Sequence, residues 1–449
     1  MKNGTFTYIL LIFLHLLIAF AVYFLPFLSK IYALIIPALG FFIVYKNKNR
    51  NNEVLYVSAY LVGAEVLLRM TGGNFNNEYV KLLIIFLMLC GMVYNNFSKN
   101  GLIYLIFLSL LIPAVFVTII NSSISTDIKK VLVFNLSGPI CLAISAMYMY
   151  QRRIFLSDLQ NILCVMGLPV ISIAAYLFLY NPNVRDVITG TQSNFETSGG
   201  FGPNQVSTIL GLGMFIFFTQ LVLFSKSKKE IIINAVLLIF ITYRGIVTFS
   251  RGGIFTAVAM IICLLYLVYK KSNATGKSKF VLVFVLTGLM AVGVWTYSSF
   301  QTYGLISKRY ANQDARGRVK ADRLGGREEI MSEELAIFLD NPVLGIGAGM
   351  GKEVRKEAFG YEAASHNEVT RMLSEHGLFG IFGLLLLVIT PFGLYINNNQ
   401  HLYFISFFAF WALTINHAAM RTAAPAFIYA LCLLHVQIKI PEEKENLIG

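Results

Sequence analysis

The residues with the clearest chemical potential lie in one polar stretch, residues 298–372, between long hydrophobic segments. His366 stands there between Ser365 and Asn367. An imidazole with an unperturbed pKa of ~6.5 can accept a proton from a hydroxyl group at neutral pH. We therefore expect a general base at His366, with a purely structural histidine as the alternative interpretation.

Arg251 is the second candidate, because it precedes Gly252 and Gly253 at the start of a hydrophobic segment. A guanidinium beside glycines can donate two parallel hydrogen bonds to a phosphate, and the missing side chains let bulky ligand groups approach. We expect an anion-binding role for Arg251. Arg244 lies shortly before it and either shares that role or only reaches the membrane interface.

Other ionisable residues can be explained by structural roles. His376 is predicted to be structural. His417 and Arg421 are four residues apart, so they either line the same cavity or bond to each other. Glu65 and Arg69 have the order and spacing of an ion pair within one helix.

The glycine-rich run at residues 341–351 lacks the spacing of a nucleotide-binding loop. We expect a flexible turn whose exposed amides can at most help to hold an anion. A helix is predicted just before it, over residues 327–339, because apolar and acidic residues alternate there with helical spacing. Pro342 follows the end of that helix.

The composition indicates a membrane protein. Hydrophobic residues make up 57% of the chain and charged residues 13%, and the mean hydropathy is +0.68. Barrel-like alternation is absent, and backbone amides in lipid need internal partners, so we expect an all-α polytopic bundle of about 12–14 transmembrane helices. The apolar runs cover residues 6–25, 29–45, 54–70, 79–94, 101–120, 130–150, 157–180, 203–224, 231–247, 253–269, 280–297, 374–396, 401–417 and 422–438.

The chain is predicted to be one membrane domain, residues 1–449, with the 298–372 loop inside it. All five cysteines lie in predicted spans, which argues against a disulfide framework. No Cys-x-x-Cys motif is present, so the sequence indicates no metal or redox site.

Lysine and arginine are distributed unevenly between alternate connections. If the N-terminus is cytoplasmic, most basic connections face the cytoplasm, although Lys129 and Lys130 oppose the trend. The positive-inside rule then places both termini in the cytoplasm and the 298–372 loop outside. This bias explains much of the net charge of +13, so nothing indicates a nucleic-acid partner. The basic residues in the connections that are predicted to be cytoplasmic are Lys46, Lys48, Arg50, Lys99, Arg152, Arg153, Lys226, Lys228, Lys229, Lys270, Lys271, Lys277 and Lys279.

A series of short landmarks resembles the O-antigen ligase and polymerase superfamily of bacterial membrane proteins. They occur in the family's order and surround one loop, and the resemblance covers mainly residues 199–380. The landmarks are GGFGPNQ at 199–205, SRGG at 250–253, GREEI at 326–330, DNPVLGIG at 340–347, SHNEV at 365–369 and LSEHGLFG at 373–380.

The resemblance implies a metal-independent, GT-C-like membrane glycosyltransferase without a cofactor. Such an enzyme moves a glycan from a polyprenyl (undecaprenyl) pyrophosphate carrier to an acceptor such as lipid A-core or a growing polysaccharide. It acts at the periplasmic face of the bacterial inner membrane and contacts membrane lipid.

The resemblance also suggests roles for individual residues. Arg251, with Arg244 or Arg327 as a second contact, would hold the pyrophosphate and offset charge on the leaving group. His366 would deprotonate the acceptor hydroxyl. Further expected substrate-binding residues are Asn204, Asn367, Arg371 and Glu375.

Three alternatives remain at this point. Ligases and polymerases share the landmarks, and we favour a ligase because one loop carries a single His-Asn element. A related protein O-glycosyltransferase is also compatible. A flippase or transporter of lipid-linked oligosaccharides belongs to another class, in which ionisable groups usually lie within spans rather than at one face.

Overall fold

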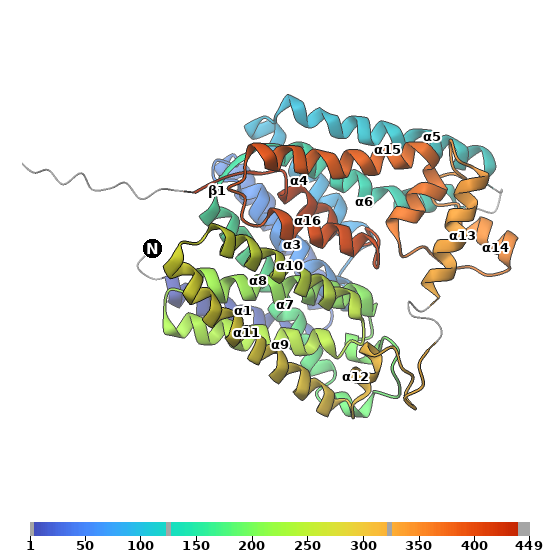
Figure 1. The fold of residues 1–449 in the computed structure, drawn as a ribbon. Helices are drawn as coiled ribbons and strands as arrows, with labels where there is room; N and C mark the ends of the chain where they lie inside the picture. Colours follow the sequence, from blue (N-terminus) through green and yellow to red (C-terminus); the bar gives the residue numbers. More distant parts are fainter. Residues whose placement is uncertain (1–3, 123–126, 321–325, 439–449) are drawn as a thin grey trace, which may run out of the picture.

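Long helices lying side by side make up most of the molecule (Figure 1). The structure is a computed structural model that describes residues 4–122, 127–320 and 326–438. The longer helices are α1 (Gly4–Phe24), α2 (Leu28–Asn47), α3 (Glu53–Met70), α4 (Tyr79–Asn95), α5 (Ile103–Asn121), α6 (Ile128–Met149), α7 (Leu156–Tyr180), α8 (Pro203–Thr219), α9 (Lys228–Ile246), α10 (Arg251–Lys271), α11 (Ala274–Gln301), α15 (Glu368–Asn397) and α16 (Phe404–Ile415).

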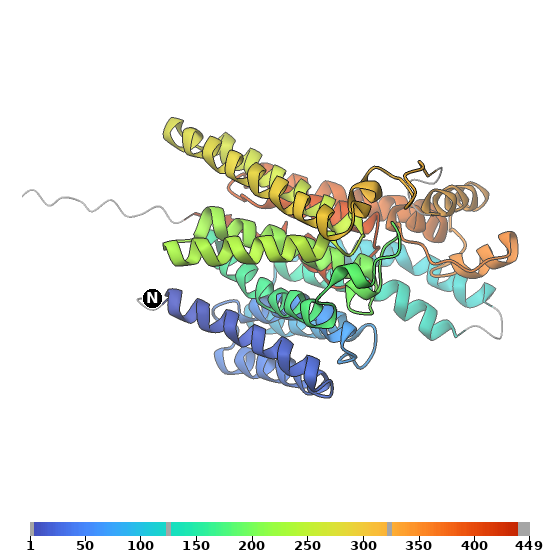
Figure 2. The same cartoon turned by 90° about the horizontal axis from the view of Figure 1, so that it is seen from below.

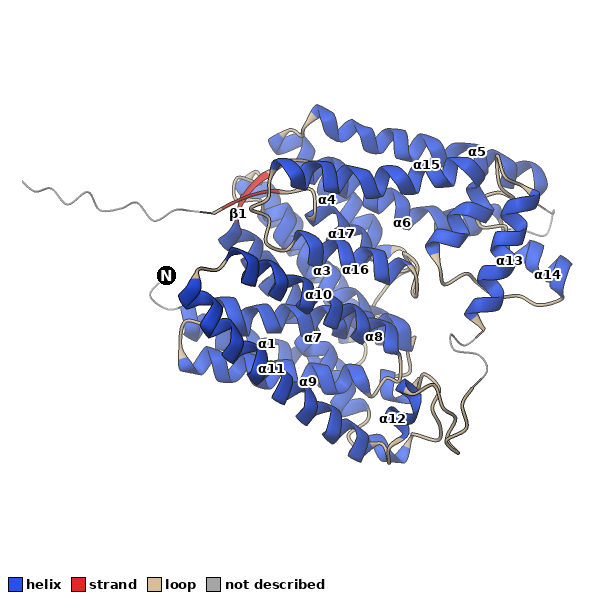
Figure 3. Cartoon of the chain, viewed as in Figure 1, coloured by secondary structure: helices blue, strands red, loops and turns tan. Residues whose placement is uncertain are grey.

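Shorter elements connect these helices. They are the 3-10 turns η1 (Lys99–Leu102), η2 (Val184–Asp186) and η3 (Glu196–Ser198), the π-helical turn η4 (Gln220–Phe224), and the helices α12 (Leu305–Tyr310), α13 (Arg327–Asp340), α14 (Gly351–Phe359) and α17 (Ala424–Leu431). The strands β1 (Arg153–Phe155) and β2 (His435–Gln437) pair in parallel. Figure 3 shows how small this strand content is beside the helices.

The predicted all-α membrane architecture is confirmed. Each of the fourteen predicted spans contains a helix, and nine described helices are long and apolar enough to cross a membrane by length and composition. α4 and α16 are apolar but shorter, while α3 and α9 carry more charged residues. The chain is therefore a multi-pass membrane protein.

The helices differ in how deeply they are enclosed. The apolar part of α8 is 78% buried within the protein, whereas that of α11 is 11% buried and presents its side chains outward. Two glycines bring α8 against α10: a Cβ at Gly211 would lie 2.2 Å from Gly253 O, and one at Gly253 would lie 2.1 Å from Ser207 O. Small residues permit such close helix contacts in lipid.

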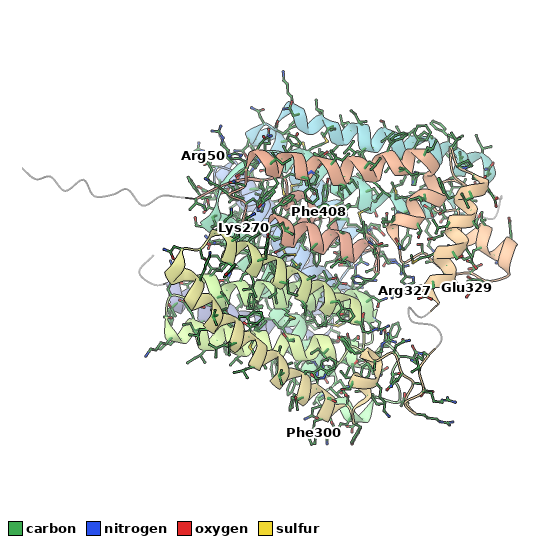
Figure 4. The ribbon with its side chains drawn as sticks, in the orientation of Figure 1. Arg50, Lys270, Phe300, Arg327, Glu329 and Phe408 are labelled. Carbon is green, nitrogen blue, oxygen red and sulfur yellow. The ribbon has the colours of Figure 1, made fainter. Side chains whose placement is uncertain are left out.

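The polar elements gather at one end of the bundle. α12, α13 and α14 lie at the right in Figure 1, while the start of α1 and β1 lie at the left. Figure 4 places Arg327 and Glu329 at the first end and Arg50 and Lys270 at the other. We refer to the end that carries α12, α13 and α14 as the loop end.

α13 spans Arg327–Asp340, which confirms the helix predicted there. The loop after it packs into an interruption of α15 at Gly377, whose backbone has φ 59° and ψ −139°. A Cβ on Gly377 would lie 2.5 Å from Val343 O, and Leu378 N donates to Pro342 O at 2.8 Å. Only glycine fits this left-handed position so close to another backbone.

The expectation of a flexible turn with exposed amides at residues 341–351 is wrong. Ile346 N donates to Ser374 O at 3.0 Å, and Ala348 N donates to Ala114 O at 3.1 Å. These amides are therefore occupied by α15 and α5. The run is a packed connection that fixes α13 relative to α15, because buried backbone groups need partners of this kind.

Reporter fusions test which end of the bundle faces the cytoplasm. Gln313 follows α12 at the loop end, and Ser227 precedes α9 at the opposite end. The basic residues at the latter end predict that Ser227 is cytoplasmic and Gln313 extracytoplasmic. Alkaline phosphatase should be active only at Gln313, and green fluorescent protein should be fluorescent only at Ser227. The reverse pattern would contradict this orientation.

Candidate active site

The segment that carries His366 is held by the start of α15. Asn367 caps this helix, since its Oδ1 accepts hydrogen bonds from Val369 N at 2.9 Å and Thr370 N at 3.4 Å. Ser365 Oγ donates to Asn367 O at 2.9 Å and tightens the turn. His366 is thus fixed one residue before a helix cap rather than on a loose loop.

The hydrogen bonding of His366 selects one tautomer. Its Nδ1 lies 3.0 Å from Ala364 O, and a carbonyl oxygen can only accept, so Nδ1 carries the proton. Burial, reinforced by the positive charges of Arg421 and Arg327, lowers the pKa of His366 to about 4. The imidazole is therefore neutral at pH 7, and its Nε2 holds a lone pair that can accept a proton.

Three arginines from three different helices lie near one another, and one of them, Arg327, also lies beside this imidazole. Arg251 begins α10, Arg309 lies in α12 and Arg327 begins α13. Burial, together with the charges of Arg251 and Arg327, lowers the pKa of Arg309 to about 10. Burial and the charge of Arg251 likewise lower the pKa of Arg327. Each of these guanidinium groups therefore lies within the electrostatic field of another.

Backbone contacts hold part of this cluster together. Arg251 Nη1 donates to Arg309 O at 3.3 Å, and Arg309 Nε donates to Phe249 O at 3.1 Å. Arg309 forms no ion pair with a carboxylate in the part of the chain that the structure describes. Partly buried cations that repel one another favour a bound anion, and planar guanidinium groups suit phosphate oxygens.

Tyr310 adds a hydrogen-bond donor to the arginine cluster. Its hydroxyl is buried without a hydrogen-bond partner among the described residues. Its ring packs edge-on against Trp295, with 4.9 Å between the ring centroids. Burial raises the pKa of Tyr310 to about 12, although Arg251 and Arg309 oppose that rise, so the hydroxyl keeps its proton. It can donate that proton in a hydrogen bond to an anion.

A small cavity of about 100 Å³ is lined by both the imidazole of His366 and Arg327. His417 forms another wall, and a Cβ at Gly252 would lie 2.4 Å from its ring, so the glycine beside Arg251 lets the imidazole approach. Burial is the main cause that lowers the pKa of His417 to about 4. The cavity is lined by Arg327, Ile330, Met331, His366, Asn367, Asn416 and His417.

A larger cavity of about 560 Å³ lies on the other side of the segment 364–368. Two of the arginines that line it, Arg355 and Arg371, are paired with carboxylates: Arg371 contacts Glu368 and also Glu375, the latter at 2.8 Å. The further charged and polar lining residues of this cavity are Asn76, Asn77, Glu78, Lys130, Asn135, Glu334, Lys352, Ser365 and Arg421.

The paired charges of this cavity form a hydrogen-bonded network. Arg355 is held by Glu333 at 3.1 Å and Glu334 at 2.8 Å. Glu334 also accepts hydrogen bonds from Thr370 Oγ1 at 2.5 Å and Ser365 Oγ at 3.2 Å. The network ties α13 and α14 to the start of α15 and so supports the segment before Asn367.

The structure brings together most of the residues singled out in the sequence. Arg327, His366 and Asn367 line the small cavity, and Arg251 lies close enough to Arg327 for its charge to lower the pKa of Arg327. Asn204 is adjacent, because its Oδ1 accepts a hydrogen bond from Ser250 Oγ at 2.8 Å.

Three other predicted residues lie elsewhere. Arg371 and Glu375 pair with each other in the larger cavity. Arg244 is fully buried and donates to Asn181 O at 3.2 Å and to Leu177 O. It therefore binds carbonyls at the C-terminal end of α7, and it lines neither cavity.

Sequence reasoning missed Arg309 and Tyr310. They lie in a short run, Ser307-Lys308-Arg309-Tyr310, that has the composition of an ordinary polar loop. Only the folding of α12 back toward Phe249 places them beside Arg251. Arg421 and His417 were recognised as a pair four residues apart, but they contact different partners: Arg421 donates to Ser365 O at 3.0 Å.

The fold and the site define a multi-pass membrane protein with a cluster of arginines and a neutral histidine at one end. Residues 233–385 match the family model described as O-Antigen ligase. No curated protein matches the sequence. The match at residues 233–385 supports the resemblance to the O-antigen ligase and polymerase superfamily that the landmarks predict.

Members of this family are membrane glycosyltransferase-like enzymes that act on lipid-linked glycans and polysaccharide acceptors. The matched span contains the three arginines of the cluster together with Tyr310 and His366. The match therefore covers these five residues of the candidate site, while Asn204 and His417 lie outside it.

Proposed function

We propose that this protein transfers a glycan from a polyprenyl pyrophosphate carrier to an acceptor hydroxyl at the outer face of the bacterial inner membrane. The observation that carries the proposal is the neutral imidazole of His366 beside Arg327, whose guanidinium group lies close to those of Arg251 and Arg309. A polyprenyl pyrophosphate has an apolar tail that stays in lipid and an anionic head at the interface. The cluster lies where such a head would be, at the end of the transmembrane helices.

The chemistry is a direct displacement at the anomeric carbon. The acceptor oxygen attacks that carbon, the bond to the pyrophosphate oxygen breaks, and the acceptor proton moves to Nε2 of His366. Arg251, Arg309 and Arg327 offset the charge that develops on the leaving pyrophosphate, a task that divalent cations perform in other enzymes. One displacement inverts the configuration of the anomeric centre.

The larger cavity is the proposed entry for the acceptor. It borders the same segment, 364–368, on the opposite side from the small cavity. Its paired carboxylates and guanidinium groups supply both acceptors and donors for hydroxyl groups, as a sugar requires. Arg371 and Glu375 would contact the acceptor there, and Asn204 would contact the glycan near Arg251.

The active-site assignment is tested by substitution. Arg251→Ala and His366→Ala should each lower transfer by about 100-fold or more, because they remove charge stabilisation and the base respectively. Arg251→Lys should restore only part of the rate, since lysine cannot make two parallel hydrogen bonds. The measurement is the rate at which purified protein transfers a glycan from a synthetic polyprenyl pyrophosphate-linked donor. The rate of the wild-type protein should be the same with and without EDTA.

The control for these variants is Lys270→Ala, at the opposite end of the bundle. It should transfer at the wild-type rate, and all variants should elute as single species of unchanged size. A fully active His366→Ala would refute the assignment of the base. Loss of activity in EDTA that zinc or magnesium restores would refute the metal-independent mechanism.

The proposed subtype is a ligase, which takes a finished chain from the carrier. Deleting its gene should therefore leave long, multi-repeat glycans on the polyprenyl carrier and none on the final acceptor. A polymerase would instead leave single repeat units on both. Mass spectrometry of extracted polyprenyl-linked glycans distinguishes the two results, and single repeats alone would favour the polymerase.

A further inference from the structure

A third cavity, of about 1020 Å³, lies between α1 and α2 and has α3 and α7 as its floor. α1 packs mainly on α7 and α2 mainly on α3, while α1 and α2 contact each other only slightly. Figure 2 shows these first two helices, in dark blue, along one edge of the bundle. We call this cavity the α1–α2 groove.

The walls of the groove are apolar and continue onto the outer surface of the bundle. Leu14 of α1 and Leu39 of α2 line the groove and are themselves exposed. Further apolar lining comes from Ile18 of α1, Ile35 and Ile43 of α2, Val57 of α3 and Val165 of α7. Such a surface on a membrane protein suits hydrocarbon chains.

Polar groups deeper in the groove satisfy one another. Tyr32 and Tyr60 join their hydroxyl groups at 2.8 Å, and His15 Nε2 lies 3.0 Å from the Tyr60 hydroxyl. His15 Nδ1 is in turn 2.7 Å from Leu11 O. The polar atoms of these three side chains therefore have partners beside a hydrocarbon chain.

The mouth of the groove carries charges of both signs. Arg50, Arg153, Glu53 and Asp158 all line it, at the end opposite the candidate active site. Within residues 4–122, 127–320 and 326–438, none of these four forms an ion pair. Glu53 accepts hydrogen bonds from the backbone and side-chain nitrogens of Asn51, both at 3.0 Å.

We propose that the α1–α2 groove binds a glycerophospholipid whose headgroup carries a phosphate and a primary amine. Its acyl chains would lie along the apolar walls, while Arg50 and Arg153 contact the phosphate and Asp158 contacts the ammonium. A purely anionic headgroup would face the carboxylates of Glu53 and Asp158 without an opposite charge. A trimethylated amine has no N–H to donate to them. This site is separate from the proposed glycan transfer.

Lipid selectivity of the purified full-length protein tests the proposal. Native mass spectrometry would follow titration with dioleoyl phosphatidylethanolamine, phosphatidylglycerol and phosphatidylcholine. The ethanolamine lipid should bind about 10-fold more tightly than the other two, as expected for hydrogen bonds between charged groups. Equal binding of all three lipids, tighter binding of phosphatidylglycerol, or no retained lipid would each overturn the proposal.

Two sets of variants locate the lipid. Arg153→Gln and Asp158→Asn should each weaken binding of the ethanolamine lipid by about 10-fold, whereas Lys270→Gln, outside the groove, should not. Leu39→Trp should block the groove, and Phe42→Trp, an equally exposed position of α2 that does not line it, is the matched control. Wild-type affinity in Leu39→Trp would overturn the location. If a charge variant fails to fold, the selectivity of the wild-type protein still decides the question.

Discussion

The repulsion between partly buried guanidinium groups is the constraint on which the site depends. Arg355 and Arg371 show how the protein neutralises such charge when it serves structure, because each is held by two carboxylates. Arg309 and Arg421 have no such carboxylate partner in the described part of the chain. Among the described residues, the fold therefore keeps guanidinium groups without a carboxylate partner at one end of the bundle, and the charges of Arg421 and Arg327 add to burial in lowering the pKa of His366.

This arrangement of charges exists only because separate chain segments are held together by backbone packing. The close contact of α8 and α10 through Gly211 and Gly253 sets the position from which Arg251 extends. The loop after α13 fills the interruption at Gly377 and fixes α13 against α15. Arg327 is the first residue of α13, and His366 lies just before α15. The contacts that fix these two helices therefore also set the distance between the guanidinium group and the imidazole.

Much of the fold follows from hydropathy, because every apolar run long enough to cross a membrane contains a helix. Arg251, Arg327 and His366 could be recognised because arginine beside glycine and histidine before a helix are chemically distinctive. Arg309 and Tyr310 could not, since their role arises from how α12 folds back. Arg244 has the same residue type as Arg251, yet it binds carbonyls of α7, and only tertiary structure separates the two.

The hydrogen bonds of the backbone amides explain why residues 341–351 form a packed connection and not the expected flexible turn. Glycines at 345, 347 and 349 suggested a mobile turn, but all three have positive φ and pack against neighbouring helices. A glycine-rich sequence permits both arrangements. Which one forms depends on the partners of its amides, and these lie far away in the chain, in α5 and α15.

The dependence of transfer rate on pH tests most directly whether burial and the nearby positive charges keep His366 available as a base. In the wild-type protein the rate should stay constant down to about pH 5 and fall as the pH drops through the pKa of His366, about 4. Arg421→Gln removes a positive charge that disfavours the protonated imidazole, so its acidic limb should move toward the unperturbed value of ~6.5. Arg421→Lys keeps the charge and should leave the limb near its wild-type position. An acidic limb that is the same in all three proteins would contradict the account.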